Sequence, residues 1–454
     1  MAYLYRTADF SSSNATSAVL SFWIKKTKND TLQGLFLGYN NASNYATCYI
    51  NNDDTIYYKE KNGGTQYETR ITSSTRKFRD LNAWMHFVFQ WDYTQATASN
   101  RIKVWINGEL QTWENSGNLP PQNYSLRLKS SDFRIGDYTA EGTNYYNWKG
   151  LMSHIHFIDD APYDTYQASS FGQYDANGVW TIKTSPSVTY GNEGFFILKD
   201  GNSGTDQSGN SNNFTVSGTI TKTEDCPSNV FATFNALYKP RGTVSYNNGN
   251  TNISSNASDW DSGISTLCAT AGKYYFEVKI NDNDGTKFSV GAIDVERDNS
   301  FVNNLETYSY LGYRGMGYYG DGTIIGNNGS SNNSNLITGL TALGTNDIVG
   351  CAVDLDNNKM YWHLNGTYIQ NGGYTQNPSS GSYGVDFSNN RNGTNPVAMG
   401  GSIRDGRAIL VNFGNGYFGT TAVSSAGTNA SGIGIFEYDV PTGYTALSTK
   451  GLNL

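Results

Sequence analysis

The feature that most constrains this chain is a series of short segments in which apolar and polar residues alternate. Clusters of Gly, Asn and Ser separate the segments, and these residues favour tight turns. A period of two places the apolar side chains on one face of a β-strand. The sequence contains no long segment with apolar residues at helical spacing and no heptads. Examples of the strand candidates are AVLSFWIKK (18–26), MHFVFQW (85–91), YYFEVKI (274–280) and IVGCAVDL (348–355).

Composition favours the same fold class. Charged residues make up 15% of the 454 residues, whereas about 25% is usual. The chain has 50 Gly and 33 Tyr but 9 Pro, a balance that favours strands and turns over helices. The length allows two or three domains of roughly 150 residues, and all-β domains of about 200 residues are common. We therefore predict an all-β protein with two antiparallel β-sandwiches of the jelly-roll type.

Charge and segment patterns exclude several kinds of partner. The net charge is −8, which argues against a nucleic-acid partner because phosphate backbones are bound by clustered Lys and Arg. The Met1 end lacks a basic region followed by an apolar one, so we expect no secretory signal. No apolar run approaches the roughly 20 residues of a membrane span. The four cysteines have no CxxC spacing, so we expect no zinc site.

A junction between two domains is indicated at residues 223–240. The alternation stops there, and two of the nine prolines lie in the stretch TEDCPSNVFATFNALYKP. We predict a first sandwich over residues 1–222, a connector over 223–240 and a second sandwich over 241–454. Because the connector contains Phe231, Phe234 and Leu237, we expect it to pack onto a domain.

Two phrases far apart in the chain are nearly the same. They are VWINGEL (104–110) and YWHLNGTY (361–368). Asn and Gly both tolerate a positive φ, which a tight two-residue hairpin requires. Each Asn-Gly pair therefore predicts a strand that turns back on itself.

The surroundings of the first phrase carry a family resemblance. WMHFV (84–88) precedes it, and FRIGD (133–137) and WKGLMSHIHFID (148–159) follow it. This order resembles the laminin-G-like, concanavalin-A-like sandwich, and DGNSGTDQSGNSNNFTVSG (200–218) resembles a stretch that commonly follows it. The resemblance covers about residues 1–222 and implies a sandwich of that type.

The surroundings of the second phrase carry a different resemblance. AGKYYFEVKI (271–280), FSVGAI (288–293) and DIVGCAVDLDNNKMYWHLNG (347–366) follow one another in the order found in SPRY (B30.2-type) domains. The resemblance covers about residues 240–454. It implies a second concanavalin-A-like sandwich, whose binding surface would be made by variable loops.

The connector and the C-terminal end resemble parts of bacteriophage proteins. CPSNVFATFNAL (226–237) is similar to a connector between such sandwiches in marine phage proteins, although Ala236 stands where that family often has Pro. VNFGNGYF (411–418) and VPTGYTALSTKGLNL (440–454) resemble the close of SPRY modules in phage structural proteins. The resemblance implies a non-enzymatic virion protein, either a tail fibre or a surface adhesin that recognises a host glycan. Two alternatives stay open: a capsid decoration or head-fibre protein that contacts sister subunits, and a lectin-like binding module.

The same resemblance sets the expected partners and location. The partners would be other virion proteins and a host-surface glycan or receptor. A homo-oligomer is expected, with a trimer favoured for a fibre. The protein would be located in the virion after assembly in the host cytoplasm.

Catalytic and metal-binding patterns are sparse. Glycosidases of related fold use paired carboxylates, and the nearest spacing is Asp294-Val295-Glu296, which fits a loop after a strand better. His154 and His156 would share a strand face and could hold a metal, but Ile155 and Phe157 indicate an ordinary sandwich strand. The loop 281–286 is rich in carboxylates but lacks the twelfth-position Glu of an EF-hand. We therefore predict no enzyme activity and no cofactor, with calcium left open.

Two aromatic clusters are the candidate binding residues. Flat aromatic rings cover sugar faces or protein surfaces at little entropy cost, and neighbouring Asn residues supply polar contacts. The alternative is that the rings pack on the domain or on a neighbouring subunit. The candidates are Tyr145, Tyr146 and Trp148 in the first cluster and Tyr313, Arg314, Tyr318 and Tyr319 in the second.

Overall fold

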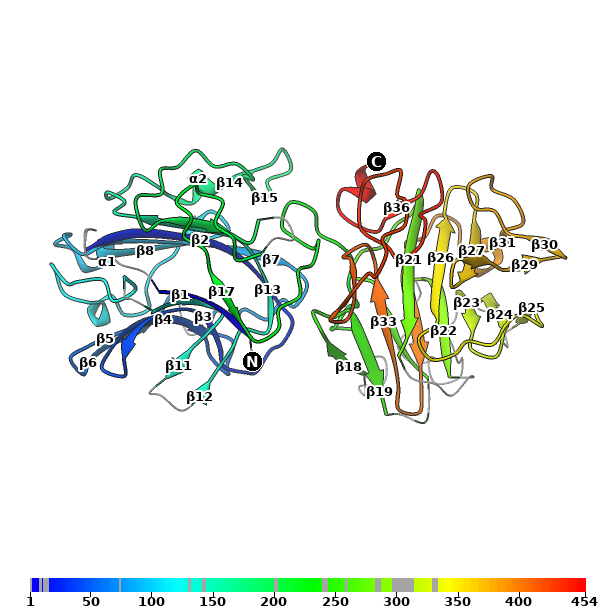
Figure 1. Ribbon diagram of the computed structural model, residues 1–454, viewed down its shortest axis with the longest axis horizontal. Helices are drawn as coiled ribbons and strands as arrows, with labels where there is room; N and C mark the ends of the chain where they lie inside the picture. The colour runs from blue at the N-terminus through cyan, green and yellow to red at the C-terminus, as the bar shows by residue number, and fades with distance from the viewer. Residues whose placement is uncertain are drawn as a thin grey trace. The chain divides into compact units, whose positions relative to one another are not determined.

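The chain divides into two compact units. A computed structural model describes residues 2–7, 10, 16–72, 75–129, 132–140, 144–199, 203–238, 244–256, 258, 260–281, 287–295, 314–328 and 334–454 (Figure 1). The first unit comprises Met1–Lys222 and Cys226–Ser228, and the second comprises Thr223–Asp225 and Asn229–Leu454. Both units are built from antiparallel β-sheets, so the all-β prediction is confirmed.

Two sheets form the first unit, and Figure 1 shows them facing one another. Their strand pairings are antiparallel throughout. The seven-stranded sheet has the order β17 (Thr215–Ser217), β1 (Tyr3–Thr7), β10 (Asp132–Ile135), β3 (Gln33–Asn41), β4 (Asn44–Ile50), β5 (Ile56–Asn62), β6 (Thr65–Arg70). The six-stranded sheet has the order β16 (Phe195–Ile197), β13 (Gly150–Asp159), β2 (Ser17–Lys26), β7 (Trp84–Asp92), β8 (Ile102–Ile106), β9 (Glu109–Leu110).

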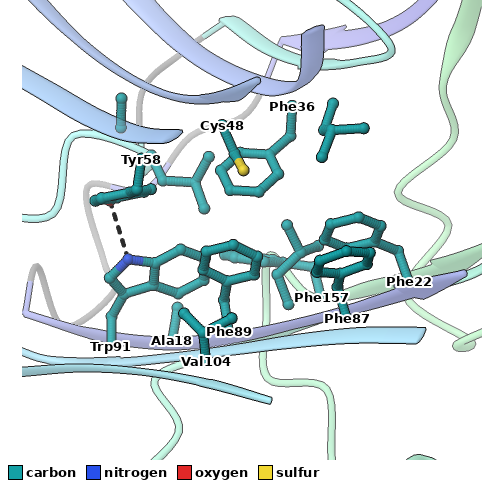
Figure 2. Close-up of a cluster of buried hydrophobic side chains, with 14 of the residues drawn as sticks. Ala18, Phe22, Phe36, Cys48, Tyr58, Phe87, Phe89, Trp91, Val104 and Phe157 are labelled. Carbon is teal, nitrogen blue, oxygen red and sulfur yellow. Dashed lines mark hydrogen bonds between the residues drawn. The ribbon is translucent and has the colours of Figure 1, made fainter. Parts of the chain in front are cut away.

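Aromatic side chains from the two sheets meet in the core of the first unit (Figure 2). Phe36 and Tyr58 come from the seven-stranded sheet, and Phe22, Phe89 and Trp91 come from the six-stranded sheet. The ring of Phe36 packs edge-on against Phe89, with centroids 5.3 Å apart. Because the indole of Trp91 is buried, its Nε1 needs an acceptor, and it donates to the Tyr58 hydroxyl at 3.0 Å. The apolar residues of β2 and β7 therefore form the core, as the alternating pattern of these strands predicts.

The second unit is also a pair of sheets. Its largest sheet contains one parallel pairing, between β21 and β36. Its strands are β18 (Val244–Asn247), β19 (Asn252–Ser255), β33 (Arg407–Asn412), β21 (Lys273–Ile280), β26 (Ile348–Asp354), β27 (Lys359–Leu364) and β28 (Thr367–Tyr368), with β31 (Val385–Asp386) on β27 and β36 (Thr445–Ala446) on β21. The other sheet has the order β20 (Asp261–Ile264), β32 (Val397–Ile403), β22 (Phe288–Asp294), β23 (Arg314–Tyr319), β24 (Thr323–Asn328), β25 (Ser334–Ile337).

Short elements complete both units. The α-helices of the described residues have four residues each. The short elements are α1 (Ala98–Arg101), α2 (Ala168–Phe171), η1 (Ser116–Asn118), η2 (Ser388–Asn390), η3 (Gly451–Asn453), β11 (Thr139–Ala140), β12 (Asn144–Tyr145), β14 (Gly172–Tyr174), β15 (Trp180–Ile182), β29 (Gln370–Asn371), β30 (Tyr374–Thr375), β34 (Tyr417–Phe418) and β35 (Thr421–Ala422).

Both Asn-Gly pairs form the predicted hairpin turns. Asn107 and Gly108 have φ values of 49° and 86°, and Asn365 and Gly366 have φ values of 49° and 84°. Two positive φ values in succession are the geometry that Asn-Gly favours. The side chain of each Asn also accepts a backbone N–H from the neighbouring strand, at 2.8 Å for Asn107 and 2.9 Å for Asn365. The turn residues therefore also hold the adjacent strand end.

The segment between the sandwiches contributes to the core of the second unit. Phe234 is fully buried there among residues of both sheets. Phe231 is buried in a separate apolar cluster with Tyr275 and Phe436. Leu237 is 65% exposed, so it does not take part in this packing.

Candidate functional site

The structure brings one residue of the first predicted cluster onto a row of tyrosines. Tyr146 lies after β12, and its amide donates to the carbonyl of Tyr138. The rings of Tyr138 and Tyr146 are stacked with centroids 5.9 Å apart. Tyr145 lies in β12, and the position of its side chain is outside the described part of the structure. Trp148 instead packs against the core, and its indole donates to the carbonyl of Leu151.

The tyrosine row consists of Tyr57, Tyr49, Tyr138 and Tyr146. Tyr49 and Tyr57 are direct partners on β4 and β5, and their rings stack at 5.4 Å. Tyr138 stacks on the other side of Tyr49 at 4.8 Å. Their neighbours Cys48 and Tyr58 point into the core, so the alternation of each strand places the row on the outer face of the seven-stranded sheet.

Charged groups line the tyrosine row. The guanidinium of Arg70 lies 5.0 Å from the ring centre of Tyr57 and pairs with Glu114 through two hydrogen bonds. The hydroxyl of Tyr49 donates to Glu68. On the same face Lys59 lies over the ring of Tyr45. Tyr49 and Tyr138 are buried, whereas Tyr57 and Tyr146 at the ends of the row are half-buried and supply its accessible aromatic surface. Fixed polar groups beside these rings suit a ligand that has both apolar faces and hydroxyls.

The second predicted cluster is not brought together. Tyr313 lies outside the described residues, and Arg314 begins β23. Tyr318 and Tyr319 are consecutive strand residues and therefore point to opposite faces. Tyr318 is fully buried in the core, and its hydroxyl donates to the carbonyl of Thr341. Its ring does not reach the surface, because the alternation of β23 directs it inward.

Tyr319 occupies a small cluster on the other face of its sheet. It packs with Trp260 and Ile325, and the two aromatic ring centres are 5.6 Å apart. The guanidinium of Arg404 lies 5.1 Å from the ring centre of Trp260. Tyr319 is itself buried, so the aromatic surface at this position is small.

A buried carboxylate lies inside the first sandwich. Glu60 is on the core face of β5, where the hydroxyls of Tyr58 and Tyr93 both donate to its Oε1. Oε2 accepts the amide of Arg127 at 3.3 Å. Burial raises the pKa of Glu60 to about 7. The hydrogen-bond partners of Glu60 are tyrosine hydroxyls and a backbone amide, which hold the carboxylate inside the core.

A second buried carboxylate, Glu277, lies in a polar row across the second unit. The residues Asn412, Glu277, Gly350, His363 and Tyr368 stand side by side on five adjacent strands. Gly350 leaves room for the imidazole, because a Cβ there would lie 1.9 Å from His363 Nε2. Burial raises the pKa of Glu277 to about 7 and lowers the pKa of His363 to about 4.

Hydrogen bonds order this polar row. The amide of Gly366 donates to His363 Nδ1 at 3.1 Å, so Nε2 carries the proton and donates to the Tyr275 hydroxyl at 2.7 Å. Tyr275 in turn donates to Glu277 Oε1 at 3.0 Å. The amides of Glu437 and Tyr438 also donate to Glu277, at 2.9 and 2.8 Å. The C-terminal segment therefore covers the carboxylate.

The predicted metal positions are not assembled into a site. A β-bulge lies between Ser153 and His156, and His154 has a φ of 47°, so the strand alternation that would align the two histidines is broken. His156 stacks on Phe196 at 3.9 Å, and burial holds its pKa well below the ordinary range. Across the described ranges, no group of three or more His, Cys, Asp or Glu residues could hold a metal ion.

Two other candidates fall partly outside the described residues. In the carboxylate-rich loop 281–286, only Asn281 is described. Glu296 is likewise outside, whereas Asp294 is buried and accepts the amide of Asn392 at 2.7 Å. Asp294 therefore ties β22 to the loop before β32.

The geometry defines an all-β protein of two sandwiches, with a row of stacked tyrosines on an outer face of the first. Residues 3–164 match the family model described as the concanavalin A-like lectin/glucanases superfamily, Laminin_G_3, and residues 273–396 match the SPRY domain. These matches confirm the two resemblances drawn from the sequence. Laminin-G-like and SPRY domains are typically non-catalytic binding modules.

Solved structures with similar folds share little sequence with this chain. The SPRY domain of human HERC1 is 12% identical, with 37% of this chain and 91% of that chain covered and a TM-score of 0.25. Domains LG4-5 of the mouse laminin alpha1 chain are 9% identical, with 90% and 85% covered and a TM-score of 0.26. A heptameric pentraxin from Limulus polyphemus is 14% identical, with 36% and 71% covered and a TM-score of 0.26. At such TM-scores these likenesses carry no argument about function.

No curated protein sequence matches the chain. In the described part of the chain, no helix is long and apolar enough to cross a membrane.

Several residues of the tyrosine row were missed by sequence reasoning. Tyr49 and Tyr57 are far from the predicted cluster in sequence, whereas Tyr138 lies only seven residues before Tyr145. A signal was present, because Tyr45, Thr47 and Tyr49 alternate with the apolar residues of β4. The pattern shows which face these residues occupy, but it does not show which strands lie beside them.

Proposed function

We propose that this chain is a non-enzymatic glycan-binding protein carried on the surface of a bacteriophage particle, as a tail fibre or adhesin. The observation that carries the binding role is the tyrosine row on the outer face of the seven-stranded sheet. The half-buried rings of Tyr57 and Tyr146 present apolar surface at the ends of the row, and Arg70 and Glu68 supply polar groups beside it. Sugars offer the matching combination of C–H faces and hydroxyls.

The virion setting is supported by sequence. The connector over 226–237 and the segment over 440–454 resemble parts of phage structural proteins. In this setting the partners are other virion proteins, and a homo-oligomer presents several copies of the row to one cell surface. A capsid position in contact with sister subunits is the second candidate for the same chain.

A non-enzymatic role is supported by the two buried carboxylates. Glu60 and Glu277 are each enclosed by hydrogen-bond donors from their own sandwich. A glycosidase requires a second carboxylate about 5–10 Å away across the scissile bond. The expected result with bacterial polysaccharides is binding without the release of new reducing ends.

The binding test uses an array of bacterial capsular polysaccharides and lipopolysaccharide glycans with the full chain. We expect Tyr146→Ala and Tyr57→Ala to weaken binding about tenfold, equivalent to about 1.4 kcal/mol. Tyr174→Ala is the matched control, because Tyr174 is an exposed tyrosine of the same unit that lies on β14. Equal binding by all three variants contradicts the tyrosine row as the site.

The virion test is a copy-number measurement. Quantitative mass spectrometry of purified particles is expected to find this chain at a fixed ratio to the major capsid protein. Antibody labelling under the electron microscope then separates a tail position from a capsid position. Particles that lack the chain contradict the virion setting and leave the glycan result standing.

A further inference from the structure

A pair of exposed tyrosines projects from the second unit. Tyr374 begins β30 of the hairpin β29–β30, labelled at the margin of that unit in Figure 1, and Tyr383 lies before β31. Tyr374 is 61% exposed and Tyr383 is 48% exposed. Their rings are nearly parallel, at 11°, with centroids 4.9 Å apart. The pair therefore presents aromatic surface to solvent in a fixed orientation.

Hydrogen bonds hold the two tyrosines in place. The side chain of Asn371 donates to the carbonyl of Tyr383 at 3.1 Å, which links the hairpin to the second ring. Asn377 and Ser382 exchange two backbone hydrogen bonds, at 3.0 and 2.9 Å. The amide of Thr442 donates to the hydroxyl of Ser379 at 3.0 Å. An ordered loop presents a ring pair with little entropy left to lose on binding.

The backbone at Tyr383 is strained. Its φ of 60° lies in the left-handed region, where a bulky residue is an outlier. The following residue, Gly384, is fixed against the ring of Tyr361, because a Cβ there would lie 2.5 Å from it. Glycine would occupy position 383 without strain. Strained backbone of this kind clusters at ligand-contacting positions, and at Tyr383 it accompanies an exposed ring.

The surrounding chemistry selects the ligand class. Residues 369–385, IQNGGYTQNPSSGSYGV, contain no charged side chain, whereas the whole chain is 15% charged. A segment without Lys or Arg gives no attraction to phosphate or to an acidic sugar. Two rings also cover far less than the roughly 800 Å² per partner of a stable protein interface. Amides, hydroxyls and a flat ring face match a neutral sugar.

We propose that Tyr374 and Tyr383 form a neutral-saccharide site, in which an outer ring face stacks on the C–H face of a pyranose. Side-chain amides and hydroxyls of the same loop bond the sugar hydroxyls. This site lies in a different unit from the tyrosine row and does not rest on it.

The experiment is saturation-transfer NMR on the full chain with lactose, cellobiose and N,N′-diacetylchitobiose, and with an acidic comparator, 3′-sialyllactose. We expect at least one neutral sugar to receive saturation on its C–H face. Tyr374→Ala and Tyr383→Ala are expected to weaken that binding about tenfold. Tyr174→Ala is the control, because Tyr174 is 53% exposed and contacts Trp180 edge-on at 4.9 Å.

Tyr383→Gly separates binding from folding. It removes the strain at φ 60° and the ring together, so the melting temperature is expected to stay the same or rise while sugar binding is lost. A purely structural role for Tyr383 predicts a lower melting temperature instead. The proposal is overturned if none of the three neutral sugars binds, or if binding is equal in wild type and both alanine variants. A loss of binding in Tyr146→Ala alone places the sugar on the tyrosine row and also overturns it.

Discussion

Each sandwich contains one buried glutamate whose pKa is raised to about 7, but the two are held differently. Glu60 lies between the sheets, and its principal donors are two tyrosine side chains of the core. Glu277 lies on the outer face of its sheet, and two of its donors are backbone amides of the C-terminal segment. The first glutamate therefore joins core side chains, whereas the second fastens a chain segment to a sheet.

The two sandwiches nevertheless share one arrangement of side chains beside the Asn-Gly turns. In the first unit the indole of Trp180 packs on Gly108 and donates to His86 Nδ1 at 3.0 Å. In the second unit the ring of Tyr438 packs on Gly366 and lies edge-on to His363. In both cases an aromatic side chain from a later segment covers a turn and a buried histidine. The arrangement around each turn is the same, but the segment that covers it is different, namely the one with Trp180 in the first unit and the one with Tyr438 in the second.

The largest expected effect comes from removing each glutamate. Glu277→Ala leaves the amides of Glu437 and Tyr438 without their acceptor, at about 1–3 kcal/mol for each orphaned donor. We expect limited proteolysis to cut the C-terminal segment of this variant early. Glu60→Ala is expected to lower the unfolding free energy by a similar amount without that early cut. Identical cleavage patterns would contradict the difference between the two sites.

The pH dependence of Glu277 is the next effect. Because its pKa rises from 4.5 to about 7 on folding, the folded state loses stability as the pH rises from about 4.5 to 7, by about 3 kcal/mol at 1.4 kcal/mol per pKa unit. His363 acts in the opposite direction, because its pKa falls from 6.5 to about 4 and stability is lost as the pH falls through that range.

The variant His363→Gln removes the opposing contribution of the histidine to the second unit, while Glu60 of the first unit contributes a decline of the same sign in both proteins. We expect the unfolding free energy of the variant to fall steadily from pH 4.5 to 7, whereas the wild-type chain shows a flatter profile between pH 4.5 and 6.5. Urea denaturation at a series of pH values, followed by fluorescence, measures both. A flat profile in His363→Gln would show that Glu277 titrates in its ordinary range.

A smaller effect is expected at Gly350. In Gly350→Ala the new Cβ would lie 1.9 Å from His363 Nε2, and displacing a buried ring costs about 1–3 kcal/mol. Gly117→Ala is the control, because its Cβ would meet Asn115 Oδ1 at 3.2 Å. Thermal unfolding is expected to show a lower midpoint in Gly350→Ala than in the control. The opposite order would mean that the imidazole moves without cost.

The smallest effect tests the shared turn. Asn107→Ala loses the hydrogen bond with the His86 amide and places Ala at a φ of 49°. Asn365→Ala loses the equivalent bond with the Ile348 amide at the same φ, and it also loses the bond from its Nδ2 to Asp347 Oδ1 at 2.8 Å. We expect each to lower the unfolding free energy by about 1–2 kcal/mol, with the larger loss in Asn365→Ala. Equal losses, measured by denaturant unfolding, would show that the Asn365–Asp347 bond adds nothing to stability.

Only Tyr146 of the tyrosine row was predicted from the sequence. The alternation of β4 and β5 places Tyr49 and Tyr57 on one face of the sheet, but it does not show that Tyr138 and Tyr146 stack beside them. Tyr318 and Tyr319 illustrate the limit, because two adjacent rings on a strand point to opposite faces and cannot form one surface. His154 illustrates a second limit of sequence-based prediction. A bulge shifts the register of its strand, and the spacing of residues in the sequence does not reveal a bulge.

By itself the sequence determined the all-β class, the two sandwich families and the two hairpin turns. The class and the turns depend on the period of two and on the backbone preferences of Asn and Gly, which act within a few residues. The two families were indicated by the resemblance of several motifs in their order along the chain. Only the tertiary structure decided which tyrosines stack, which glutamate lies in a core and which lies under the C-terminal segment. Those contacts join residues far apart in the chain, such as Glu277 with Tyr438 and Tyr49 with Tyr138, and no local preference encodes them.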